Sequence, residues 1–221
     1  MNKLKSVGRC VYCGQFYDKR GIGKHLDTHL TQQPTAPTAK AFHVRVEAAE
    51  MFLELLIDAR TTLSNVDGYL RKIWLECCGH LSAFRPQGSY EEIAMTRKVG
   101  AFFSTGLVLN YEYDFGSTTV LRVKVGKTFS IPVNKGIELL SRNEPLDIRC
   151  DACHQQPATQ ICTIHVYEGN GFLCDACSET HAEECEDFAD YAGLPVVNSP
   201  RMGVCGYEGG TIDTGRDGVF S

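Results

Sequence analysis

Hydrophobic residues between positions 41 and 145 follow two periodicities, one typical of strands and one typical of a helix. Residues 51–58 form a short apolar run bounded by polar residues, which predicts a largely buried strand. Farther along, apolar residues recur at helical spacing at Leu63, Val66, Leu70, Ile73, Trp74 and Cys77. This stripe predicts an amphipathic helix, with Thr61 or Thr62 as its N-terminal cap.

Two later segments predict a β-hairpin. Residues 106–114 and 118–125 are rich in β-branched and aromatic side chains, and they flank a short Phe-Gly-Ser sequence at 115–117. The stretch 41–145 therefore combines strands with a helix, and it is long enough to form a core of its own. We expect it to be an α+β domain.

The rest of the chain divides by composition into four shorter segments. Residues 1–30 hold a compact pattern of cysteine and histidine, and residues 31–40 are typical of a linker because they contain two prolines and no large apolar residue. Residues 146–191 hold a longer Cys/His pattern, and 192–221 form a glycine-rich tail. The expected architecture is a central α+β domain flanked by a small ββα zinc finger and a small cross-brace zinc module.

The first Cys/His pattern has the spacing of a C2H2-type zinc finger. Cys10 and Cys13 are separated by two residues, as on a turn, whereas His25 and His29 are four apart, as on one side of a helix. Such an arrangement lets a turn and a helix meet one tetrahedral zinc. In a unit of about thirty residues the metal would contribute on the order of 10 kcal/mol and would largely determine the fold.

The finger is basic, which favours an anionic partner. In a DNA-reading finger the base-facing positions would be Asp18, Arg20, Gly21 and Lys24. Because Gly21 presents no side chain, we expect Lys19, Arg20 and Lys24 to hold phosphates rather than to read bases. The rival hypothesis is that the finger docks a protein.

The second pattern consists of four ligand pairs in regular order. If alternate pairs share an ion, two closed zinc sites result, one formed by Cys150, Cys153, Cys174 and Cys177 and the other by Cys162, His165, His181 and Cys185. The first set also has the spacing of a zinc ribbon, whereas the second rests on the analogy of interleaving, with Cys185 as its weakest member. The alternative is one zinc with the remaining thiols free. Three zinc ions are therefore expected in the whole chain, or two on a cautious count.

This string of pairs resembles the B-box zinc modules, in which interleaved pairs bind two zincs and the surface recognises other proteins. The resemblance implies structural rather than catalytic metal, because fully ligated zinc has no open position for water.

Composition supports zinc as the cofactor. Hydrophobic residues make up 43% and charged residues 22% of the chain, which is ordinary for a globular protein. No apolar run could span a membrane and no signal peptide is visible, so we expect a cytoplasmic protein. Eleven cysteines is a high and odd count for that compartment, where cysteines more often bind metal than form disulfides.

The formal net charge of −5 hides an uneven distribution. Residues 1–30 carry a net charge of +4, and residues 147–191 carry −9. Two zincs with six thiolates would add about −2 to the second segment, which would repel phosphate and favour a protein partner. The alternative interpretation is that both charged runs are solvated surface.

The sequence Cys77-Cys78-Gly79-His80 follows the predicted helix and permits three interpretations. It could hold a nucleophile and its base, or join the distant Cys205 in a further metal site. The favoured alternative is that the two cysteines fill the core at a helix end as small apolar residues. The chain contains no phosphate loop, dinucleotide fingerprint or Gly-x-Ser-x-Gly motif.

Two motifs carry a family resemblance: Leu-Arg-Lys-Ile-Trp-Leu-Glu-Cys-Cys-Gly-His-Leu at 70–81 and Tyr-Glu-Tyr-Asp-Phe-Gly at 111–116. They resemble a bacterial family named after an open reading frame on an agrobacterial root-inducing plasmid, whose members are also described as passenger proteins of insertion elements. The similarity covers about residues 45–145. The acidic Cys-rich segment and the sequence at 200–207 also look like extensions of some members. The resemblance implies an α+β fold and a mobile-element origin, and it supplies no activity.

The sequence thus predicts a non-enzymatic zinc-binding protein. Its basic finger would contact nucleic acid, and its acidic zinc module would dock protein. A pure protein–protein adaptor is the main alternative, and an enzyme that uses Cys77, Cys78 or His80 is a third. We infer no small-molecule substrate.

Overall fold

A computed structural model describes residues 4–218 of the chain. These residues fall into two compact units. The larger comprises 6–70 and 80–143, and the smaller comprises 4–5, 71–79 and 144–218. Both contain strands and helices, with sheet predominating, so the predicted α+β class is confirmed. Among residues 4–218 no helix has the length and apolar character needed to cross a membrane.

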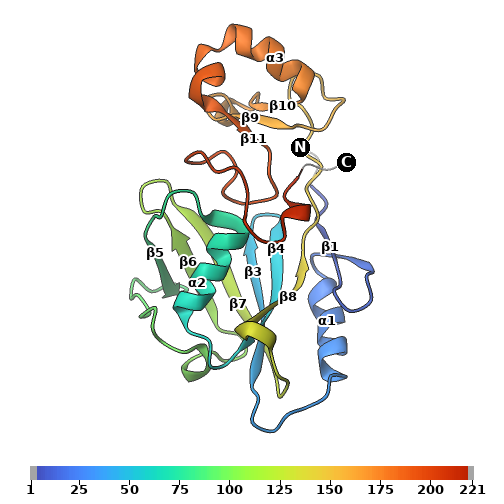
Figure 1. Cartoon of the computed structure of the whole chain (residues 1–221), viewed down its shortest axis with the longest axis vertical. Coiled ribbons are helices and arrows are strands. Elements are labelled where there is room, and N and C mark those ends of the chain that lie inside the picture. The colour runs from blue at the N-terminus through green and yellow to red at the C-terminus, as the bar shows by residue number, and fades with distance from the viewer. Residues whose placement is uncertain (1–3, 219–221) are drawn as a thin grey trace. The chain divides into compact units, whose positions relative to one another are not determined.

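The larger unit is built on a six-stranded antiparallel sheet in the order β5-β6-β7-β3-β4-β8 (Figure 1). The strands are β3 (Ala41–Ala48), β4 (Met51–Asp58), β5 (Ser82–Pro86), β6 (Val108–Tyr113), β7 (Thr119–Phe129) and β8 (Ile137–Arg142). All eight residues of β4 are buried, as the apolar run at 51–58 predicts for a strand covered on both faces. Strands β6 and β7 form the predicted hairpin.

The predicted helix is shorter than its hydrophobic stripe. Helix α2 spans Leu63–Leu70 and passes into a π-helical turn, η1, at Arg71–Leu75. The α-helical spacing fails there because Ile73, Trp74 and Leu75 are all buried, and three successive residues cannot share one α-helical stripe. Thr62 is the cap: its Oγ1 accepts a hydrogen bond of 3.3 Å from the backbone N–H of Asn65.

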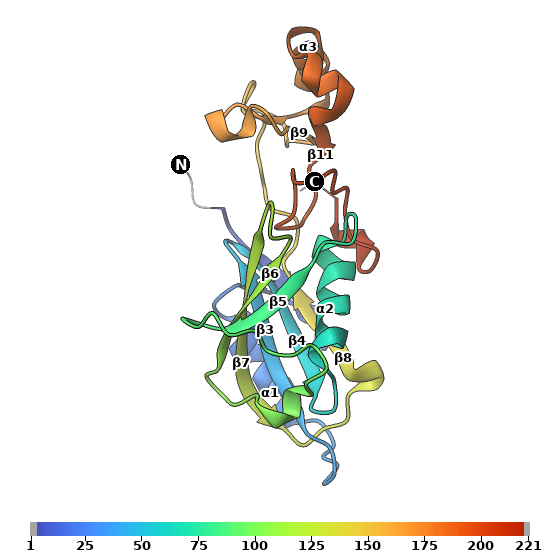
Figure 2. The same cartoon turned by 90° about the vertical axis from the view of Figure 1, so that its left-hand side faces the viewer.

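Helix α2 covers one face of the sheet. Asp67 of this helix accepts hydrogen bonds from the Tyr111 hydroxyl of β6 at 2.7 Å and from the Ser82 hydroxyl of β5 at 2.6 Å. The opposite face is covered by the N-terminal segment, which folds as β1 (Val7–Arg9), β2 (Phe16–Asp18) and α1 (Ile22–Thr31) (Figure 2).

The N-terminal segment packs on the sheet through a continuous apolar cluster. Ile22, Leu26 and Leu30 of α1 are buried together with Phe52 and Leu56 of β4. Close approach also occurs at β1, because a Cβ on Gly8 would lie only 2.6–2.8 Å from atoms of Ser141, Phe52 and Arg142. The finger segment and the sheet therefore share one core.

The smaller unit has little regular structure. A three-stranded sheet orders β9 (Gln160–Cys162) between β10 (Phe172–Leu173) and β11 (Gly193–Pro195), and α3 (Asp175–Glu184) follows β10. Ala158, Ile161 and Val196 form one small buried apolar cluster in this unit. A cluster of this size contributes little stability without cross-links.

The glycine-rich tail is held in the smaller unit by specific hydrogen bonds. The Ser199 hydroxyl donates to the Trp74 carbonyl at 2.5 Å, and the backbone N–H of Thr211 donates to the Lys72 carbonyl at 2.7 Å. A Cβ on Gly210 would lie 2.6 Å from the Ile73 carbonyl oxygen. Short helical turns complete the chain: η2 (Val99–Ala101), η3 (Asn134–Gly136), η4 (Val166–Glu168), η5 (Phe188–Ala192) and η6 (Thr214–Arg216).

Candidate metal centres

The structure brings together the ligand atoms of every metal set predicted from the sequence. Within each set, one nitrogen or sulfur atom of each residue lies within 4.8 Å of the corresponding atoms of the others. The sets are Cys10, Cys13, His25 and His29; Cys150, Cys153, Cys174 and Cys177; and Cys162, His165, His181 and Cys185. These Cys/His clusters are compatible with zinc binding.

The spacing of the ligand atoms provides a test of that compatibility. With Zn–S bonds of about 2.3 Å and Zn–N bonds of about 2.0 Å, a tetrahedral site places two sulfurs about 3.8 Å apart and two nitrogens about 3.3 Å apart. The Sγ atoms of Cys153 and Cys174 are 3.9 Å apart, and the Nε2 atoms of His25 and His29 are 3.2 Å apart. Both separations match the edges of a zinc tetrahedron.

The first cluster lies where the β1–β2 turn meets helix α1. His25 and His29 stand one turn apart on α1, and the Cys13 Sγ lies 3.3 Å from the His25 Nε2. Cys10 is buried in the apolar cluster shared with the sheet. The Tyr17 ring stacks on the His25 ring with centroids 3.9 Å apart, which fixes the orientation of the imidazole.

In two different clusters, the first cysteine pair lies on a turn of the same conformation. The backbone N–H of Gly14 donates to the Cys10 carbonyl at 2.9 Å, and that of His154 donates to the Cys150 carbonyl at 2.9 Å. Both Gly14 and His154 adopt left-handed backbone conformations, with φ of 72° and 57°. This turn brings the two thiols of a Cys-x2-Cys pair together, which is why that spacing predicts a metal site.

The four-cysteine cluster joins this second turn to the start of α3. Backbone N–H groups of Gln155 and Gln156 lower the pKa of Cys153 to about 6. Hydrogen bonds among the crowded sulfurs, chiefly from Cys174 and then Cys150, raise the pKa of Cys177 to about 12. A divalent cation would reverse that effect by stabilising all four thiolates.

In the mixed Cys/His cluster the second and fourth ligand pairs along the segment lie close together in space. Cys162 ends β9, and its Sγ lies 3.2 Å from the His165 Nδ1. His181 stands one turn after Cys177 on α3, so this helix contributes to both clusters of the smaller unit. The His181 Nε2 is buried and has no hydrogen-bond partner among residues 4–218. A metal ion would satisfy such an atom.

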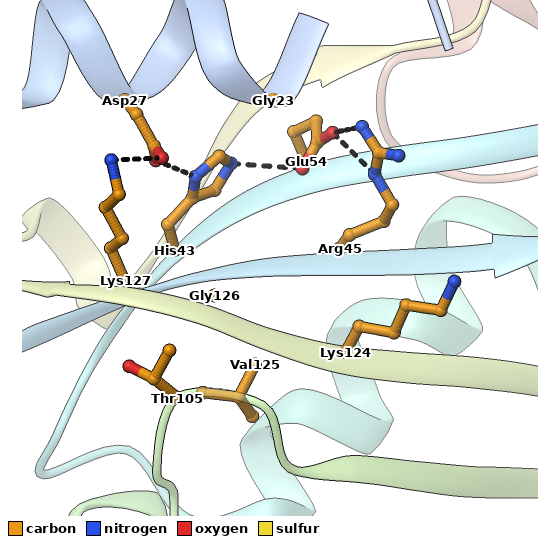
Figure 3. A pocket seen from close by; sticks show the side chains of 10 residues that line it. All are labelled: Gly23, Asp27, His43, Arg45, Glu54, Thr105, Lys124, Val125, Gly126 and Lys127. Carbon is orange, nitrogen blue, oxygen red and sulfur yellow. Dashed lines mark hydrogen bonds and ion pairs between the residues drawn. The ribbon is translucent and has the colours of Figure 1, made fainter. Parts of the chain in front are cut away.

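A charged network that the sequence analysis missed lies between α1 and the sheet (Figure 3). The His43 Nδ1 is 2.7 Å from Asp27 Oδ1, and its Nε2 is 3.0 Å from Glu54 Oε2. Arg45 donates to Glu54 through Nε at 2.7 Å, and the Lys127 Nζ lies 3.1 Å from Asp27 Oδ2. These residues line a cavity of about 270 Å³.

His43 is the centre of this network, and its side chain is only 7% exposed. Burial alone would lower the pKa of His43, but the Asp27 and Glu54 carboxylates outweigh burial and raise that pKa to about 9. The imidazolium therefore links the finger helix to the sheet. Its sequence signal was weak, because Asp27 and His43 are sixteen residues apart and belong to different predicted segments.

The three predicted phosphate-contacting residues differ in their surroundings. The Lys19 ammonium donates a hydrogen bond to the Ala49 carbonyl oxygen, whereas the Arg20 and Lys24 side chains are exposed. Lys24 also lines a hollow of about 310 Å³ that it shares with Lys127 of β7. A lysine of the sheet therefore lies beside Lys24 of the N-terminal segment.

Comparison with known proteins supplies no function. No protein-family model and no curated protein match the chain. A solved structure that it resembles is a protein of unknown function, MM3350, from Methanosarcina mazei Go1. The match has 16% sequence identity and a TM-score of 0.39, and it covers 47% of this chain and 67% of that protein.

Proposed function

We propose that this is a non-enzymatic interaction protein of the reducing cytoplasm, stabilised by zinc at the three predicted clusters. The observation that carries the proposal is that each cluster gathers four Cys/His ligand atoms within 4.8 Å of one another. Zinc with four protein ligands has no position for water or substrate, so such sites are structural. In the smaller unit the two zincs would add cross-links to the small apolar cluster of Ala158, Ile161 and Val196.

The acidic zinc module is the proposed protein-docking surface. Its net charge of −9 over residues 147–191 disfavours an anionic partner. The module also has three large apolar side chains at its surface: Tyr167 is 87% exposed, Tyr191 62% and Ile164 43%. Exposed aromatic residues within a charged surface are typical of protein interfaces.

The finger is the proposed nucleic-acid contact. Ile22 and Leu26 of α1 are buried against the sheet, so only part of the helix faces solvent, with Lys24 on it and Arg20 just before it. Lys127, beside Lys24, adds a third cation. Side chains of this kind neutralise phosphates without reading sequence.

The experiment is fluorescence anisotropy of random DNA and RNA duplexes with the full chain across a salt series. Binding should weaken with salt by a log–log slope of about −0.9 for each phosphate contacted on DNA. The double variant Arg20→Ala/Lys24→Ala should lower the affinity and reduce the magnitude of that slope by about two contacts. The matched control Arg97→Ala/Lys98→Ala removes two exposed cations from a different loop of the same unit and should change neither quantity.

Salt-insensitive binding, or equal behaviour of the two double variants, would contradict the nucleic-acid part of the proposal. The protein–protein adaptor would then be preferred, because the exposed aromatic side chains of the acidic module support it without the finger. The enzyme hypothesis has its own test, which is rapid, stoichiometric alkylation of Cys77 or Cys78, faster than that of glutathione, in the zinc-loaded protein near neutral pH.

A further inference from the structure

Three cysteines outside the predicted metal sets converge in the smaller unit. The Cys78 Sγ lies 3.7 Å from the Cys205 Sγ and 4.0 Å from the Cys77 Sγ. Cys77 and Cys78 follow the turn η1, whereas Cys205 belongs to the tail, 127 residues farther along the chain. The convergence is thus produced by the fold and not by local sequence.

The sulfur separations fit a metal site and do not fit a disulfide. A tetrahedral zinc places two sulfurs about 3.8 Å apart, which lies between the two observed distances. A disulfide would require about 2.05 Å. These sulfurs therefore have the same spacing as those of Cys153 and Cys174, which are 3.9 Å apart.

The charge beside the thiols also suits a zinc-thiolate group. The buried guanidinium of Arg201 lies with its Nη2 3.7 Å from the Cys77 Sγ. Three thiolates with one zinc dication carry a net charge of −1, which a neighbouring guanidinium balances.

The backbone at Cys205 adopts a conformation that needs outside support. Cys205 has a φ of 53° and Gly206 a φ of 65°, so a side-chain-bearing residue occupies the left-handed region. Such a residue costs of order 1–3 kcal/mol unless its surroundings hold it there. His154, beside the Cys150–Cys153 pair, has a similar φ of 57°.

We propose a fourth zinc site formed by Cys77, Cys78 and Cys205, with His80 as the fourth ligand. His80 is separated from Cys78 by Gly79 alone, so the covalent chain itself keeps the imidazole within reach of an ion held by Cys78. With this site all eleven cysteines of the chain become metal ligands, and the odd count is explained.

The site binds the tail to the segment that follows α2. It adds a metal cross-link to the hydrogen bonds that Ser199 and Thr211 make with residues 72–74. Cys78 and Cys205 are exposed, whereas each of the other clusters includes at least one buried cysteine. The fourth zinc is therefore expected to be the first that a chelator removes.

Native mass spectrometry of the full zinc-loaded chain tests the proposal. The wild type should bind four zincs, and Cys205→Ser should bind three. The matched control His154→Asn should keep four, because His154 belongs to no cluster and Asn tolerates its left-handed conformation. Circular dichroism of each variant establishes that it has folded.

A second measurement needs no variant. In the zinc-loaded wild type, Cys78 and Cys205 should react with N-ethylmaleimide about tenfold more slowly than glutathione does, because a zinc-bound thiolate is a poorer nucleophile than an exposed free one. Three bound zincs with both cysteines reacting at the glutathione rate would overturn the fourth site and leave the proposed function intact. A mass lower by two hydrogens without reductant would indicate a Cys78–Cys205 disulfide and would also overturn it. Fewer than three zincs would instead contradict the proposed function.

Discussion

The His43→Gln substitution should remove a pH-dependent part of the stability of the larger unit. In the wild type the imidazolium lies between the Asp27 and Glu54 carboxylates, and Arg45 and Lys127 flank those acids on their far sides. Glutamine can donate a hydrogen bond to one carboxylate, but it carries no charge at any pH. The variant therefore keeps a side chain of similar size at position 43 but has no group there that gains or loses a proton.

The magnitude follows from the two pKa values of His43. Its pKa rises from 6.5 to about 9 on folding. A group with a raised pKa in the folded state stabilises it fully below the unfolded pKa, and this contribution is lost as the pH rises through the folded pKa. A shift of roughly 2.5 pKa units corresponds to about 3 kcal/mol, most of which disappears between pH 6.5 and 9.

The assay is urea unfolding of the wild type and the variant at several pH values from 6 to 9, followed by far-UV circular dichroism in a zinc buffer. The difference in unfolding free energy between the two proteins should fall by about 2–3 kcal/mol across that range. Zinc sites cannot mimic this result, because their ligands must lose protons and metal binding strengthens as the pH rises. A difference that stays constant with pH would refute the assignment of a charged His43.

Two further substitutions test the packing of the finger segment on the sheet. Gly8→Ala should lower the unfolding free energy by about 1–3 kcal/mol in the same urea assay, because the added Cβ would lie less than 3 Å from atoms of Ser141 and Phe52. An unchanged unfolding midpoint would show that β1 does not approach the sheet so closely. Leu26→Ala should cost about 2–5 kcal/mol through the cavity it leaves beside Phe52 and Leu56, whereas a finger that folds separately from the sheet would leave the unfolding of the sheet unaffected.

Local patterns in the sequence predicted the features that depend on neighbouring residues. The strand at Met51–Asp58 has the predicted bounds because an unbroken apolar run leaves few alternatives. The pairs of metal ligands were recognisable because the two members of each pair lie within about one turn of each other. In the smaller unit the first and third pairs along the chain lie together, and so do the second and fourth. The helix after Leu63 was predicted too long, since periodicity alone does not distinguish an α-helix from the π-helical turn at Arg71–Leu75.

Features that join distant residues gave almost no sequence signal. Nothing in the local sequence marked His43 as charged, because Asp27 is on a different element and Glu54 is on the neighbouring strand. Cys205 could be suggested as a partner of Cys78 but not placed, since only the folded tail brings the two sulfurs together. The structure of the glycine-rich tail could not be predicted from its sequence, because its hydrogen bonds go to the distant residues Lys72 and Trp74.

Zinc K-edge X-ray absorption of the zinc-loaded full chain tests the central claim most directly, namely that the metal sites are closed and structural. The account predicts four ligands for each zinc and, averaged over all sites, between two and three sulfurs at about 2.3 Å with the remainder nitrogen at about 2.0 Å. A fifth ligand, or fewer than two sulfurs per zinc, would mean open or adventitious sites and would contradict the account.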